Sequence, residues 1–233
     1  MNRRDGLMAA LVWLAATGVT VVQAQAPAPP VGELKPLGQD RYQIGRIVID
    51  KRAGVFTVPG RVLVVGKPLE YLATSPAGMK AYESLLELDT TGSEFNLACI
   101  LIGLERDPKQ APWQQMRQVQ QLAGQKINLS IAWSEGGKRR QVSAAEALLN
   151  ADSGVKPESV EWVYSGAPAS EVQGRFVADD TGTLIGFVHD VNSIIESRAG
   201  IGIGAYGSVR GHPMLPPIGS AIELIVESTA PTK

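Results

Sequence analysis

The chain has 233 residues, of which 44% are hydrophobic and 19% are charged, and its formal net charge at pH 7 is -1. This composition is typical of a globular protein, and the small net charge excludes a bulk electrostatic attraction to nucleic acid or to an anionic membrane. The single cysteine, Cys99, excludes an internal disulfide, cysteine-rich zinc sites and the common iron–sulfur clusters.

The first residues have the three-part layout of a secretory signal peptide. Two arginines give a positive start, residues 7–22 form an almost uninterrupted apolar run, and small residues follow at alternate positions. We expect a signal peptide over residues 1–24, because cleavage after Ala26, the alternative, would place the rigid Pro27 at the scissile bond. The mature protein would then be periplasmic or secreted. An uncleaved membrane anchor is the other hypothesis, although the run is at the short edge of what spans a bilayer.

Residues 25–40 are rich in proline and predict an extended, solvated leader, so one domain is expected over residues 41–230. In the region that follows, β-branched residues separated by turn signals predict four short strands, at roughly 42–50, 54–58, 61–65 and 69–74. The connections between these strands are tight, which favours antiparallel pairing.

Two helices are predicted next. Residues 76–88 carry apolar side chains at helical spacing, and a second helix begins at Ser93 and is apolar nearly all round. A helix of that kind is buried on most sides, so we expect one buried core helix at about 94–104, with Cys99 as a small buried hydrophobe. A further helix over 113–122 would be only weakly amphipathic.

The second half of the chain again mixes strands with short helices. Its pattern first predicts a strand over 127–133, a return strand over 138–142 and a capped helix over 143–150. A strand over 160–164 follows, and then a hairpin of 176–178 and 184–188 around a turn at 179–182. The last predicted elements are one helical turn over 191–196 and a final strand over 221–226. The regular β-α alternation of a doubly wound fold is missing. We therefore predict an α+β fold, with mostly antiparallel sheet and two to four short helices packed on one face.

Two short motifs resemble known sites, but their context excludes those sites. Residues 202–209 reproduce the G-x-G-x-x-G-x-V of nucleotide loops, yet prolines rather than a helix follow, so we predict no nucleotide. Asp180-Thr181-Gly182 resembles an aspartic protease loop, but that chemistry needs two paired carboxylates and no second Asp-Thr-Gly exists. The glycine-rich loop at 198–217 is long for a compact domain, which makes it a candidate binding loop.

A polar group on the first predicted helix offers candidate catalytic residues. Lys80, Glu83 and Ser84 are spaced i, i+3 and i+4 and so share one helical face, with Glu70 on the strand before it. A Lys–Glu pair beside a hydroxyl can hold a polar ligand or act as acid and base. The alternative is a surface ion pair next to a helix-facing serine.

The two histidines, His189 and His212, are candidate metal ligands together with a carboxylate such as Asp190 or Glu196. Their spacing matches no ligand signature, and two unrelated surface histidines are the alternative. The scarcity of histidine and the absence of a Gly-x-Ser-x-Gly elbow also argue against a Ser-His-Asp triad.

Several short motifs, at 69–72, 78–86, 97–103, 162–166 and 176–179, follow one another in a familiar order. With these residues the chain resembles the YdjY-type domain family of exported bacterial proteins, over residues 43–227. Two positions depart from the pattern. Tyr82 and Asn96 stand where the resemblance leads us to expect histidines, so a site built on those imidazoles would be altered here.

The resemblance implies export and a single domain, and it leaves the activity open because the family has no established one. Some relatives are ferredoxin-like, but this chain lacks the cysteines that an iron–sulfur cluster needs, and we predict no cofactor. We therefore expect an exported binding or interaction module whose partner is an envelope protein or a small ligand, not nucleic acid or a membrane. A small envelope enzyme and a metal-binding protein are the alternatives.

Overall fold

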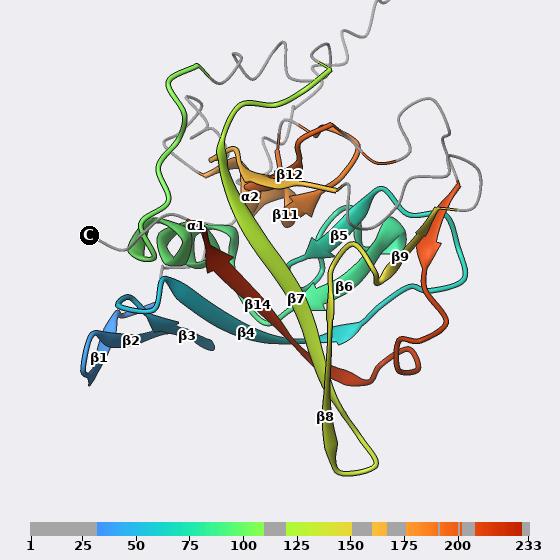
Figure 1. The fold of residues 1–233 in the computed structure, drawn as a ribbon, viewed down its shortest axis with the longest axis horizontal. Coiled ribbons are helices and arrows are strands. Elements are labelled where there is room, and N and C mark those ends of the chain that lie inside the picture. Colours follow the sequence, from blue (N-terminus) through green and yellow to red (C-terminus); the bar gives the residue numbers. More distant parts are fainter. Residues whose placement is uncertain are drawn as a thin grey trace, which may run out of the picture.

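The computed structural model describes residues 32–109, 120–150, 160–166, 176–190, 192–199, 201 and 208–229, and strands dominate this part of the chain (Figure 1). The strands are β1 (Lys35–Gly38), β2 (Arg41–Ile44), β3 (Ile47–Asp50), β4 (Val55–Val62), β5 (Tyr71–Thr74), β6 (Ser84–Leu88), β7 (Gln125–Glu135), β8 (Lys138–Ser143), β9 (Leu148–Asn150), β10 (Trp162–Tyr164), β11 (Thr183–Gly186), β12 (Ile195–Ser197), β13 (Val209–Gly211) and β14 (Ala221–Ser228). The helices are α1 (Gly92–Leu101), α2 (Val177–Thr181) and the single-turn 3-10 helix η1 (Ala81–Glu83). None of the helices among these residues is long and apolar enough to cross a membrane.

Eight of the strands close into a barrel. They follow the order β4, β14, β7, β10, β12, β11, β5 and β6, and β6 pairs back to β4. Within this ring the β5–β6 and β11–β12 pairs are parallel and the other pairs are antiparallel. The hairpin of β2 and β3 continues from β4 with β1 at its edge, and β8 extends from β7 (Figure 1).

The predicted α+β fold, with helices packed on one face of a sheet, is therefore wrong. The strands close on themselves, and the described residues contain only two α-helices. Residues 76–88 are the main cause, because their spacing predicts a helix whereas they form η1 and then β6, a strand with all five residues buried. Two of the apolar residues that give the helical spacing, Met79 and Tyr82, are exposed, so the spacing does not mark one buried face. Leu85, Leu86 and Leu88 alone form a short apolar group, and periodicity does not separate such a short run from a buried helix.

Three other local predictions are also wrong. Ser143 and Glu146 form the expected capping box, in which the Glu146 N–H donates to the Ser143 hydroxyl at 3.2 Å, but it closes one turn and the chain continues as β9, paired with β13. The turn expected at 179–182 belongs to helix α2, which ends at Gly182 in the left-handed conformation with φ of 71°. Of the helical turn predicted over 191–196, the described residues 192–194 are not helical and residues 195 and 196 belong to strand β12.

The strand β4 continues through Pro59 and Gly60, where the turn signal predicts a break between two strands. Proline is tolerated there because its nitrogen faces the end of β6, and its carbonyl oxygen accepts a hydrogen bond from Asp89, the first residue after β6, at 2.9 Å. The exposed strand β1 lies within the predicted proline-rich leader. Most of the helix predicted over 113–122 lies outside the described residues.

The helix expected at 94–104 is confirmed as α1, and its start follows from a local signal. The Thr91 side chain accepts from the Glu94 N–H at 3.2 Å, while Glu94 accepts from the Thr91 N–H at 3.2 Å. Ile100 is 50% exposed, so α1 is buried on one side rather than on most sides. The strands predicted over 127–133, 138–142, 160–164 and 221–226 are confirmed as β7, β8, β10 and β14.

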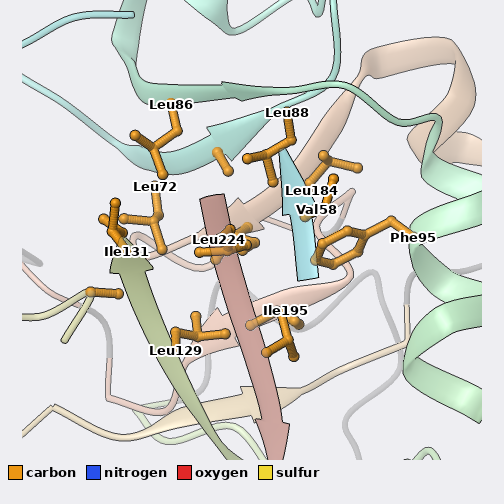
Figure 2. Packing of buried hydrophobic residues seen from close by; sticks show 14 of the residues in the cluster. Val58, Leu72, Leu86, Leu88, Phe95, Leu129, Ile131, Leu184, Ile195 and Leu224 are labelled. Carbon is orange, nitrogen blue, oxygen red and sulfur yellow. The ribbon is translucent and has the colours of Figure 1, made fainter. Parts of the chain in front are cut away.

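Aliphatic side chains from the ring strands converge in the barrel interior (Figure 2). They come from β4, β5, β6, β7, β11, β12 and β14 and include Val58, Leu72, Leu86, Leu88, Leu129, Ile131, Leu184, Ile195 and Leu224. Phe95 reaches this cluster from α1 and packs edge-on against Phe56, with the ring centroids 5.3 Å apart. The interior of the barrel is thus one continuous hydrophobic core.

The two sides of the barrel differ in exposure. Buried residues in β4, β14 and β7 alternate with more exposed ones along much of each strand, so the outer faces of these strands contact solvent. In contrast, β5, β6, β10, β11 and β12 are buried at every position. Polar side chains on this second group are enclosed, among them Tyr71 of β5 and Glu196 of β12, whose pKa values burial raises.

We expect Gly60→Ala to lower the free energy of unfolding by about 1–3 kcal/mol, the usual cost of overpacking. Gly60 pairs with Leu88 where β4 meets β6, and a Cβ at this position would overlap the Glu87 carbonyl oxygen. Urea unfolding measures the change. Gly66→Ala is the control, because no described atom lies within 4 Å of a Cβ built there. Equal stability of the two variants would contradict closure of the ring between β4 and β6.

Candidate functional site

Three of the four candidate catalytic residues, Lys80, Glu83 and Ser84, lie on η1 and its flanks rather than on a helical face, and Glu70, just before β5, meets them through its backbone. Lys80 Nζ lies 2.7 Å from Glu83 Oε1, and this hydrogen bond raises the pKa of Lys80. The Ser84 hydroxyl donates to the Lys80 carbonyl oxygen at 2.8 Å. The Glu70 N–H donates to the Glu83 carbonyl oxygen at 3.0 Å.

These contacts are those of a stabilised turn. The Ser84 side chain is fully buried and its hydroxyl proton is committed to a carbonyl, so it is not poised to attack a substrate. Glu83 is 8% exposed, and its carboxylate already forms an ion pair with Lys80. The geometry therefore matches the ion-pair alternative better than an acid–base pair open to a ligand.

Tyr71 connects this turn to a second polar group deeper in the protein. The Lys80 ammonium lies 5.7 Å from the centroid of the Tyr71 ring and also 5.7 Å from that of the exposed Tyr82. On its other side, the Tyr71 hydroxyl donates to Asp190 Oδ2 at 2.8 Å. Burial, and then the charge of Asp190, raise the pKa of Tyr71, which keeps the phenol protonated as a donor.

Asp190 and Glu196 form a buried carboxyl pair beside β11 and β12. The Asp190 N–H donates to Glu196 Oε1 at 2.9 Å, and Asp190 Oδ1 accepts from the backbone and side-chain nitrogens of Asn192 at 3.2 and 3.1 Å. Burial raises the pKa of Glu196 well above its usual value, and the charge of Asp190 adds to the effect. The Asp190 N–H and the nearby Ser193 hydroxyl act in the opposite direction, although the hydroxyl makes no well-aligned hydrogen bond with the carboxyl.

His189 is the most strained member of this cluster. Its φ of 59° is unusual for a residue with a side chain and is the kind of strain found at functional sites. Its Nε2 lies 3.1 and 3.2 Å from the carbonyl oxygens of Ser197 and Arg198, so we assign the ring hydrogen to Nε2. Within the described residues, His189 Nδ1, Ser193 Oγ and Glu196 Oε2 are buried without a hydrogen-bond partner.

The other candidate metal ligand, His212, belongs to a different region. It follows β13, its N–H donates to the Ala147 carbonyl oxygen at 2.8 Å, and its Nδ1 accepts from the Met214 N–H at 3.1 Å. No group of three or more His, Cys, Asp or Glu residues in the described part of the chain is placed to hold a metal ion. The glycine motif at 202–207 lies outside the described residues.

Cys99 is fully buried on α1, and this burial raises the pKa of its thiol. A protonated, enclosed thiol is neither a nucleophile nor a metal ligand. The residue therefore fills the core, as its apolar surroundings in the sequence predict.

A cavity of about 400 Å³ lies at the start of α1. Its carboxylates are already engaged in holding the helix in place. Asp89 pairs with Arg46 at 3.4 Å, Glu94 accepts from the Gly32 N–H at 3.1 Å, and Asp179 accepts from both the N–H and the hydroxyl of Ser93. This cavity therefore offers few uncommitted polar groups to a ligand.

Two further cavities share Trp133, near the end of β7, and we call them together the Trp133 groove. The larger, of about 610 Å³, is bordered by the loop that follows β13 and contains Pro213, Met214 and Pro217. The smaller, of about 440 Å³, includes Arg139 of β8. Both volumes suit a ligand or a few side chains of a partner. The loop residues of this groove belong to the 198–217 loop, which its length made a candidate binding loop, whereas Trp133 and Arg139 form no recognisable motif and were not singled out from the sequence.

Tyr71→Phe removes one hydroxyl and leaves the Lys80–ring contact in place. We expect it to lower the free energy of unfolding by about 1–3 kcal/mol, because Asp190 then loses a donor inside the protein. Tyr82→Phe is the control, since Tyr82 is 65% exposed and flanks the same lysine. Chemical denaturation of both variants is the measurement. A Tyr71→Phe variant as stable as the control would show that the Tyr71–Asp190 hydrogen bond contributes nothing.

Comparison with known proteins identifies the family. The YdjY domain family matches residues 47–227, close to the 43–227 over which the sequence motifs indicate a resemblance. No curated protein and no solved structure matches the chain. Because the family match covers most of the chain and includes the entire barrel, the protein belongs to the YdjY domain family.

Proposed function

We propose that this protein is an exported binding domain, which takes up an extended segment of a partner protein at the Trp133 groove. The observation that carries the proposal is the exposure of two large apolar side chains in the loop that borders the groove. Met214 and Ile218 are 41% and 66% exposed and belong to one loop, whose prolines also border the larger cavity. Exposed apolar patches with a polar rim are typical of protein interaction sites.

The form of the partner is suggested by the neighbouring strand. Among the described strands, β8 pairs only with β7, so its other edge has unpaired backbone groups. Gly137 and Arg139, at the start of β8, contribute to the smaller cavity together with residues of β7 and β14, so this cavity lies on the face of the three strands and β8 borders it. An added strand would pair with β8 and direct every second side chain towards the apolar surface.

The rim of the groove has charges of both signs. Arg139 pairs with Glu223 at 2.6 Å and Arg140 with Glu135 at 2.8 Å, and all four side chains are at least one-third exposed. Charged residues on an edge strand keep copies of a protein from pairing with one another. This arrangement favours a selected partner segment over self-association.

Export is supported by the sequence at the N-terminus, which lies outside the described residues. The arginines, the apolar run over 7–22 and the small residues Ala24 and Ala26 form the three parts of a signal peptide. In that case the domain meets its partner in the periplasm or outside the cell.

A library of random linear peptides, selected for binding to the purified protein, tests the groove. We expect the selected peptides to bind Met214→Asp at least about tenfold more weakly, because a buried, unpaired carboxylate is costly in an apolar contact. Met79→Asp is the matched control, since Met79 is 68% exposed on the distant turn before η1. The bound peptide should also slow hydrogen exchange in β8.

Any one of three results would contradict the binding proposal. The first is that the selection yields no peptide that binds, and the second is that Met214→Asp and Met79→Asp bind the selected peptides equally well. The third is that the bound peptide leaves the hydrogen exchange of β8 unchanged.

Mass spectrometry of the protein purified from its own host tests export. We expect a chain that begins at Gln25, or at Pro27 if cleavage follows Ala26. A mass that retains Met1 would contradict cleavage.

A further inference from the structure

We propose that the buried pair of Asp190 and Glu196 is an alkaline-sensitive latch, which holds the segment 187–190 against β12 while Glu196 is protonated and releases it when Glu196 ionises. This inference goes beyond the binding function and concerns the covered side of the barrel. It rests on the placement of the two carboxyl groups, on the atoms around them and on the strained backbone of His189.

The geometry favours a protonated Glu196. Its side chain is fully buried, and only one of its carboxyl oxygens, Oε1, has a hydrogen-bond partner among the described residues. A Cβ built on Gly186 would lie 2.6 Å from Ser193 Oγ and 2.7 Å from Glu196 Oε1, so both side chains crowd over this glycine. An ionised carboxylate with an unpaired oxygen is very costly in such a place, and a neutral acid avoids most of that cost.

The ionisable group that faces Glu196 makes its ionisation more difficult, because Asp190 contributes a second carboxyl group. The backbone N–H groups of Asp190 and His189 favour the ionised form, but burial outweighs them. On the neighbouring strands, Gly186 of β11 and Val163 of β10 are the residues in register with Glu196, and neither is ionisable. Beyond Gly186, β5 contributes Tyr71, which donates to Asp190.

On the side of Tyr71, the ring of Tyr71 lies between the ammonium group of Lys80 and the carboxyl group of Asp190. Lys80 lies against the Tyr71 ring and is paired with Glu83, and Glu70 adds another negative charge near Tyr71. The cluster around Glu196 is therefore poorly equipped to hold a second negative charge.

The segment 187–190 is attached by contacts that a local opening can break. The Ser197 hydroxyl donates to the Phe187 carbonyl oxygen at 3.0 Å, and His189 Nε2 bonds to the carbonyl oxygens of Ser197 and Arg198. The positive φ of His189 adds strain that is relieved when the segment leaves β12. Two adjacent carboxylates would then be hydrated instead of repelling each other inside the protein.

Release also reaches the surface. When Asp190 moves away, Tyr71 loses its acceptor, and the Tyr71 ring is the surface against which Lys80 packs. The latch thus connects the protonation of a buried acid to the exposed turn that carries Lys80 and Tyr82.

Hydrogen exchange followed by mass spectrometry from about pH 6 to about pH 10, corrected for intrinsic rates, tests the latch; this range brackets the pKa values known for buried glutamates. We expect protection of peptides covering 187–190 and 195–198 to fall as the pH rises in wild type. Glu196→Gln, which has the same shape and no acid, should not show that loss. The native state of wild type binds a proton that the unfolded state releases at ordinary glutamate pKa, so the free energy of unfolding should also decrease over the same rise in pH.

Infrared spectroscopy of wild type gives a second readout that needs no variant. At neutral pH we expect the carboxylic-acid C=O band of a protonated side chain, which disappears over the same pH range in which exchange increases. The proposal is overturned if that band is absent at neutral pH, or if wild type and a folded Glu196→Gln show the same pH dependence of exchange. If the latch proposal fails, the proposal of peptide binding at the Trp133 groove still stands, since the peptide selection tests it separately.

Discussion

The architecture depends on the contact between β4 and β6. One edge of β4 serves two partners in turn, with β3 beside its first residues and β6 beside its last, while β14 takes the whole of the other edge. Gly60 makes the second pairing possible because a larger residue would collide with the backbone of β6. Without this contact the strands would form an open sheet with two edges, and the aliphatic side chains of Figure 2 would lose their enclosure.

Closure also explains why the two sites have different characters. The side with β4, β14 and β7 keeps an outer face in contact with solvent, and at its end lie β8 and the Trp133 groove, where we propose that a partner binds. On the other side, β5, β10, β11 and β12 are covered, so Tyr71, Asp190 and Glu196 must satisfy one another in a dry environment. One barrel thus combines an accessible apolar surface with an enclosed polar cluster.

The sequence predicted the features that depend on neighbouring residues. The apolar run after Ser93 predicted α1, whose start the structure attributes to a capping box of Thr91 and Glu94, and alternating residues predicted β7, which has one exposed face. It could not separate β6 from a helix, because all of its residues are buried. The candidate site was only partly foreseen for a similar reason: the Tyr71–Asp190 hydrogen bond joins residues 119 positions apart, and no local pattern reports such a contact.

Nuclear Overhauser spectroscopy tests the closed ring most directly. Gly60 faces Leu88 and Val62 faces Leu86, and both are positions between the hydrogen-bonded pairs, where the Cα atoms of antiparallel strands approach most closely. The account predicts strong contacts between the Hα protons of each pair, together with those that join β4 to β14. If the β4–β14 contacts are seen and the β4–β6 contacts are missing, the ring is open and the account of both sides of the barrel is wrong.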